Sequence, residues 1–130
     1  MQAISTKTTP AAIGPYSQAV RAGGLVFLSG QIPLDPGTGQ MIEGGIEHQI
    51  ERVLDNLAAV LKAGGLTFDH VARTTIYLTD LTDFQRVNEA YGKRFARSPQ
   101  PARSTVQVAA LPRGARVEID AIAIVPQLPG

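Results

Sequence analysis

Residues 46–63 read IEHQIERVLDNLAAVLKA and carry the strongest structural pattern in the chain. Apolar side chains recur there every three or four residues, which is the spacing of one face of an α-helix. Gly64 and Gly65 follow, and glycine ends a helix readily because it adopts the left-handed backbone conformation without a steric penalty. The pattern therefore predicts one amphipathic helix over residues 46–63.

Shorter patterns on both sides of this helix predict strands and a second helix. The expected elements, in order, are strands 3–7, 17–22 and 25–29, helix 46–63, strand 71–78, helix 82–96, and strands 103–108 and 116–125. Gly23 and Gly24 lie between two of the strands, which is typical of a hairpin. Thr82 and Gln85 have the spacing of a capping box at the start of the second helix.

This order of elements favours an α+β sandwich, in which a mixed sheet of about six strands carries two helices on one face. The length of 130 residues is typical of one domain, so we expect residues 1–130 to form a single domain. No element is then left to cover the other face of the sheet. We therefore expect another subunit to lie against that face.

Composition excludes several classes of function. The chain has no cysteine, which excludes disulfides, thiolate nucleophiles and zinc–sulfur sites. A formal net charge of +1 lacks the basic excess of a nucleic-acid-binding protein, so we expect no nucleic-acid partner. There is no apolar run of roughly 20 residues and no apolar stretch in residues 1–10. The sequence thus favours a cytoplasmic protein without a membrane span.

Asn88 interrupts the apolar stripe of the second expected helix. It lies about 40° from Phe84 in helical projection, at the margin of the stripe formed by Phe84, Val87, Tyr91 and Phe95. A buried amide needs hydrogen-bond partners. The pattern alone favours a core asparagine bound to nearby backbone over a ligand contact.

Arg103 and Glu118 also break the apolar pattern. Arg103 follows the stiff Pro99-Gln100-Pro101 stretch, and it either binds a carboxylate bidentately or forms a structural ion pair. Glu118 is either a base with a raised pKa or, somewhat favoured by the pattern, an edge residue near the turn. If the last two strands form a hairpin, Glu118 falls near Gln107 on the face that carries Arg103.

Three stretches together resemble the reactive-intermediate deaminase family, RidA or YjgF. They are Gly14-Pro15-Tyr16-Ser17-Gln18-Ala19, Leu28-Ser29-Gly30-Gln31-Ile32-Pro33, and Pro101-Ala102-Arg103-Ser104 with Val117-Glu118-Ile119. The resemblance implies a fold similar to chorismate mutase and a homotrimer with three clefts between subunits. It also implies hydrolysis of 2-enamine or 2-imino acids, such as 2-aminoacrylate and 2-aminocrotonate, to 2-oxo acids and ammonia, without cofactor or metal.

The resemblance assigns roles to seven residues. Arg103 matches the ligand of the substrate carboxylate, and Glu118 matches the acidic residue near the attacking water. The remaining matches to cleft residues are Tyr16, Ser29, Gly30, Asn88 and Thr105. Thr105 stands where several relatives carry cysteine, which removes any thiol-dependent behaviour. A protein that binds small carboxylate metabolites without catalysis is the main alternative, although simple binding would not need Glu118. An RNA-directed activity is the weakest alternative.

Overall fold

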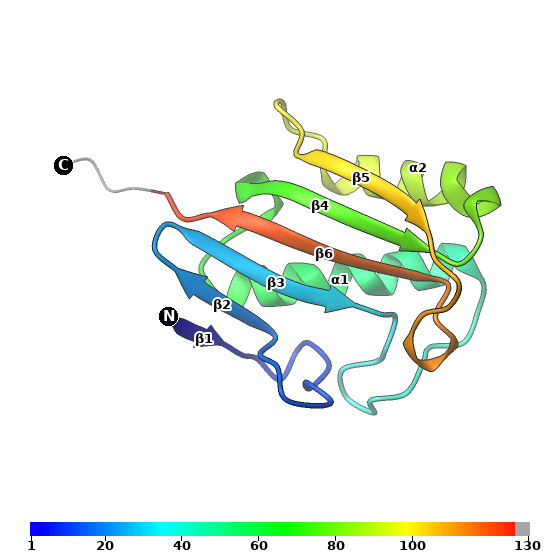
Figure 1. Ribbon diagram of the computed structural model, residues 1–130, viewed down its shortest axis with the longest axis horizontal. Helices are drawn as coiled ribbons and strands as arrows, with labels where there is room; N and C mark the ends of the chain where they lie inside the picture. Colours follow the sequence, from blue (N-terminus) through cyan, green and yellow to red (C-terminus); the bar gives the residue numbers. More distant parts are fainter. Residues whose placement is uncertain (127–130) are drawn as a thin grey trace.

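The computed structural model describes residues 1–126, which form a six-stranded sheet with two α-helices on one face (Figure 1). The elements are β1 Gln2–Ile4, β2 Ala19–Ala22, β3 Leu25–Gln31, α1 Ile46–Ala63, β4 Val71–Leu78, α2 Phe84–Arg94, β5 Ala102–Gln107 and β6 Val117–Ile124. The expected α+β architecture is confirmed. Neither α-helix in this part of the chain combines the length and apolar character needed to cross a membrane.

The strand order is β1-β2-β3-β6-β4-β5. Strands β4 and β5 run parallel, while the other neighbouring pairs are antiparallel. The expected hairpin between the last two strands is therefore wrong. Helix α2 carries the chain across one face of the sheet and returns it parallel to β4, so that β5 takes the sheet edge and β6 enters between β3 and β4.

Helix α1 begins and ends at the residues that the sequence pattern predicts. Its apolar face lies on the sheet and includes Ile50, Leu54, Leu57 and Leu61, each at most 1% exposed. Alternate residues of β6 complete this layer with Val117, Ile119, Ala121 and Ala123. The core therefore lies between the helices and one sheet face.

The start of the second helix differs from the expectation. A 3₁₀ turn spans Leu81–Asp83, and α2 follows from Phe84. The Thr82 amide donates to the Asp80 carboxylate at 2.9 Å, so the expected capping box of Thr82 and Gln85 is wrong. The carboxylate of Asp80 is a charged acceptor at the start of the turn, and it places Thr82 inside the turn rather than at its cap.

Asn56 anchors two loops to α1. Its side chain is fully buried, and its Nδ2 donates to the Leu34 carbonyl at 3.0 Å and to the Ile32 carbonyl at 3.3 Å. Its backbone carbonyl accepts from Thr9 Oγ1 at 2.9 Å. One residue of the helix thus fixes residues 32–34 and the N-terminal segment against α1.

We expect Asn56→Ala to destabilise the fold by about 1–3 kcal/mol, because the buried carbonyls of Ile32 and Leu34 lose their donor. Urea unfolding followed by circular dichroism measures the difference. Asn88→Ala is the matched control, since Asn88 is exposed, and it should change stability little. Equal destabilisation by the two substitutions would contradict the anchoring role of Asn56.

Candidate active site

Arg103 lies on the helix-covered side of the sheet. It pairs across the sheet with Thr74, whose buried hydroxyl hydrogen bonds to Tyr91 of α2 at 2.7 Å. The Arg103 guanidinium stacks 4.9 Å from the centre of the Tyr91 ring and 5.7 Å from that of Phe84. It forms no ion pair within residues 1–126. The two rings hold the guanidinium in place and leave its N–H groups available to an anion.

A hollow of about 410 Å³ opens beside this guanidinium, and we call it the Arg103 hollow. Its lining residues are Asn88, Tyr91, Gly92, Gln100, Pro101 and Arg103. Asn88 is exposed there, so the expectation of a core asparagine is wrong. Its position at the margin of the apolar stripe is enough to place it outside the core and in this hollow.

Glu118 lies on the opposite, open face of the sheet, where it pairs with Tyr77 of β4. Strand β6 is an interior strand, so the interpretation of Glu118 as an edge residue is wrong, although Glu118 does lie near the turn at Pro112–Gly114. A second hollow of about 530 Å³ lies around it, and we call it the Glu118 hollow. Its lining residues are Ile13, Tyr16, Ser29, Gly30, Ile32, Pro112, Arg113 and Glu118.

The environment of Glu118 favours its protonated form. Burial raises the pKa of the Glu118 carboxyl above its ordinary value of 4.5, and the nearby charge of Asp120 raises it further. Asp120 itself accepts a hydrogen bond of 2.9 Å from the Tyr77 hydroxyl. No cation forms an ion pair with Glu118 in the described residues. A carboxylate with a raised pKa is a better proton acceptor at neutral pH than an ordinary one.

A β-bulge in β3 brings Ser29 and Gly30 to Glu118. Leu28 pairs with Ala121 and Gln31 with Ile119, so β3 contains one residue more than β6 over this interval. The Ser29 hydroxyl donates to the Ser17 carbonyl at 2.6 Å. A Cβ atom on Gly30 would overlap the Glu118 carboxylate and lie 2.9 Å from its Cδ. Only glycine therefore leaves room for the carboxylate where it stands.

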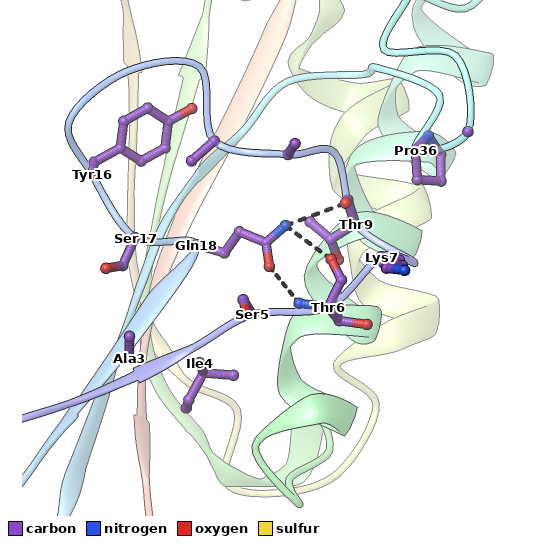
Figure 2. Close-up of a pocket in the computed structure, with 13 residues that line it drawn as sticks. Ala3, Ile4, Ser5, Thr6, Lys7, Thr9, Tyr16, Ser17, Gln18 and Pro36 are labelled. Atoms are coloured by element: carbon purple, nitrogen blue, oxygen red, sulfur yellow. Dashed lines mark hydrogen bonds between the residues drawn. The ribbon is translucent and has the colours of Figure 1, made fainter.

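The loop that carries Tyr16 is held by Gln18. The Gln18 amide nitrogen donates to the carbonyls of Thr6 and Thr9, and its oxygen accepts from the Thr6 amide (Figure 2). The same nitrogen also donates to the Pro10 carbonyl. Tyr16 is half exposed, and its hydroxyl accepts from the Ile13 amide at 3.1 Å. The hollow in Figure 2, of about 900 Å³, is a separate one that contains neither Arg103 nor Glu118.

Thr105 does not line either of the two hollows around Arg103 and Glu118. It lies two residues beyond Arg103 on the same side of β5 and pairs with Ile76. Its buried hydroxyl oxygen has no hydrogen-bond partner among residues 1–126. An unpartnered hydroxyl in this position leaves a donor and an acceptor unused on the strand that carries Arg103.

One chain does not bring Arg103 and Glu118 together. Arg103 is in register with Thr74 and Glu118 with Tyr77, three residues apart on β4. Since successive side chains of a strand point to opposite faces, the two groups lie on opposite sides of the sheet. The expectation that they share a face is therefore wrong. The structure thus contains two separate hollows, each with part of the expected residue set.

Sequence reasoning missed several residues of the two hollows. Arg113, which lines the Glu118 hollow, lies in what the pattern indicates only as a turn. Tyr91 was assigned to the apolar stripe, although an aromatic ring beneath an arginine also binds it. In the described part of the chain, no three His, Asp or Glu side chains cluster in a way that could hold a metal ion.

Comparison with known proteins places this architecture in one family. The family model described as "Endoribonuclease L-PSP" matches residues 6–125. Protein DfrA of Myxococcus xanthus is 62% identical over 125 residues, which are 95% of each chain. The mouse 2-iminobutanoate/2-iminopropanoate deaminase is 51% identical over 93% of this chain and 89% of its own. The structure of Escherichia coli TdcF with bound serine superposes with a TM-score of 0.92, at 41% identity over 97% of this chain and 100% of that one.

The chain therefore belongs to the reactive-intermediate deaminase family, as the resemblance of its three sequence stretches indicated.

We expect the pKa of Glu118 to lie above 4.5 and to fall in Asp120→Asn, while remaining raised because burial is the larger cause. Carbon-13 carboxyl NMR across a pH titration measures both values. The folded chain binds this proton more tightly than the unfolded chain. The contribution of protonated Glu118 to the stability of the fold is thus present at low pH and is lost as the pH rises through the pKa of Glu118 in the folded chain. Asp55→Asn, on α1, is the control and should leave the titration unchanged; an ordinary Glu118 pKa in the native protein would contradict the expectation.

Proposed function

We propose that this protein hydrolyses 2-imino acids to 2-oxo acids and ammonia, with each site formed by Arg103 of one subunit and Glu118 of another. The observation that carries the proposal is the position of the two groups on opposite faces of one sheet. An isolated chain offers a carboxylate-binding group in one hollow and a proton acceptor in the other. A second copy that presents its Arg103 hollow to the Glu118 hollow supplies the full set.

The open sheet face supports such an assembly. It carries Leu25, Phe27, Val106 and Ile124, which are 39–50% exposed, and no helix covers it within residues 1–126 (Figure 1). An apolar patch of this kind is typical of an interface between protein chains. The homotrimer expected from the resemblance covers this face with two further copies of the same sheet.

Arg103 binds the 2-carboxylate of the substrate. Its planar guanidinium offers two parallel N–H donors to the two carboxylate oxygens, and stacking on Tyr91 fixes the plane. Asn88 lies in the same hollow and offers an amide to the substrate. Because the carboxylate is held at two points, C2 of the substrate has a defined place relative to the neighbouring subunit.

Glu118 binds and deprotonates the attacking water. The water oxygen adds to C2 of the protonated imine, and the water proton passes to Glu118. Protonated Glu118 then gives this proton to the carbinolamine nitrogen. The C–N bond breaks and ammonia leaves as the hydroxyl proton passes to Glu118 and the 2-oxo group forms; Glu118 finally releases that proton to solvent. The imine carbon is already electrophilic, so positioning and proton transfer suffice. Tyr16, Ser29 and Gly30 line the same hollow and shape the space around the water.

Two other functions use fewer of these features. Binding of small carboxylates without catalysis is consistent with the serine bound to TdcF, yet it needs no half-buried carboxylate beside the ligand. The family description names an endoribonuclease, but a net charge of +1 offers little attraction to a polyanion. Two relatives that are named deaminases are 51% and 49% identical to this chain, which favours the hydrolytic function. The single domain and the cytoplasmic location remain predictions.

Mixed oligomers test the division of the site between subunits. Alone, Arg103→Lys should lose on the order of 2–4 kcal/mol of transition-state binding, and Glu118→Gln should lose about 10²–10⁴ in rate. When the two variants are refolded together, about one interface in four carries both intact groups if subunits assemble at random. The coupled assay, in which a dehydratase generates the imino acid, should therefore recover a fraction of wild-type activity.

Two controls accompany the mixture. Each variant refolded alone should stay inactive, and light scattering should give a mass near three times 13.8 kDa for every sample. A mixture as inactive as its components would show that Arg103 and Glu118 act within one chain or not at all. An active monomer would contradict the proposed assembly.

Gly30→Ala tests the position of the Glu118 carboxylate. The added methyl group occupies the place of that carboxylate, so we expect turnover to fall by at least about tenfold through loss of the positioned base. Binding of a 2-oxo acid, measured by calorimetry, should persist. Gly24→Ala is the matched control, since a Cβ there meets nothing within 4 Å. Normal turnover in a folded Gly30→Ala protein would contradict the role of Glu118.

A further inference from the structure

Arg113 has an unusual backbone conformation next to the Glu118 hollow. Its φ is 61° and its ψ is 21°, and it is the one residue other than glycine with a positive φ in residues 1–126. Side chains disfavour this left-handed region because Cβ crowds the backbone. Asparagine or glycine would occupy the position with less strain. Strain retained in a loop at the rim of a site points to a use for the side chain.

The side chain of Arg113 is exposed and lines the Glu118 hollow with Tyr16 and Ile13. It forms no ion pair within the described residues. The turn from Pro112 to Gly114 leads directly into β6, which carries Glu118 and Asp120. Among residues 1–126, Arg113 is therefore a cation without an ion-pair partner, and the other charged residue that lines this hollow is Glu118.

The geometry points to Arg113 as the residue that recognises a second carboxylate, at the far end of the substrate side chain. The inference rests on the proposed function: Arg103 of the neighbouring subunit holds the 2-carboxylate, and C2 lies beside Glu118. The substrate side chain then extends within the Glu118 hollow. The Glu118 carboxylate, with the charge of Asp120 near it, would repel a dianionic substrate there. Arg113 offsets that repulsion with a planar fork suited to a carboxylate. The substrate class is a short dicarboxylic 2-imino acid, hydrolysed with one water to the 2-oxo diacid and ammonia.

The experiment compares two imino acids made in place by amino-acid oxidases, one from aspartate and one from alanine. Semicarbazide captures the free imine, and the partition between capture and enzymatic hydrolysis gives a relative kcat/KM for each substrate. We expect Arg113→Gln to lower this value about tenfold for the aspartate-derived imine and less than about twofold for the alanine-derived imine. Arg113→Lys should retain part of the preference, because it keeps the charge without the fork.

Arg86→Gln is the matched control, because Arg86 pairs with Glu47 on the outer side of the helices and its loss removes the same charge elsewhere. An equal fall for both substrates in Arg113→Gln would mean general attraction of anions and would overturn the inference, as would no fall for either. Arg113→Gly relieves the backbone strain and should raise thermal stability. If Arg113→Gly keeps the preference for the dicarboxylic substrate, the Arg113 side chain does not bind the substrate and the inference is overturned. A wild-type protein inactive on both imines would instead contradict the proposed function.

Discussion

The pairing of β4 with both β5 and β6 is the constraint on which the site depends. Thr74 and Tyr77 of β4 set the registers of Arg103 and Glu118, and their odd spacing sends those groups to opposite faces. A shift of one residue in either register would reverse this result, and a shift in the β6 register would also turn the apolar residues of β6 away from α1. Packing of the core therefore fixes the two registers, and the registers place Arg103 and Glu118 on opposite faces of the sheet.

The two hollows have complementary electrostatic character. In one, aromatic rings beneath Arg103 hold a guanidinium that forms no ion pair with any residue from 1 to 126. In the other, burial and Asp120 disfavour the charged form of Glu118. In the described part of the single chain, neither the Arg103 guanidinium nor the Glu118 carboxylate has an ion-pair partner. Such an arrangement lowers the stability of the fold and is typical of a functional site. On the proposed assembly, an anionic substrate between two subunits meets the N–H donors of Arg103 on one side and the proton-accepting carboxylate of Glu118 on the other.

The local patterns of the sequence predicted the elements well. Helix α1 was predicted at its observed bounds because its apolar period is long and glycine follows it. The pairing of the strands was not predictable in the same way, since β6 pairs with β3 some 90 residues earlier and no local pattern encodes that contact. The roles of the site residues came from the resemblance, while the exposure of Asn88 did not follow from the pattern alone, which placed it at the margin of the helical stripe. Arg113 offered no signal, because its backbone conformation does not follow from its residue type.

The separation of Arg103 and Glu118 by the thickness of a sheet has a consequence for the life of the protein in a cell. On the proposed assembly, a newly made chain is folded but inert, and chemistry begins only when subunits meet. Activity then rises more steeply than protein concentration at low abundance, where subunits are mostly apart. Natural selection on the reaction also acts on surfaces far from either hollow, because any substitution that weakens assembly removes catalysis without touching a residue of the site.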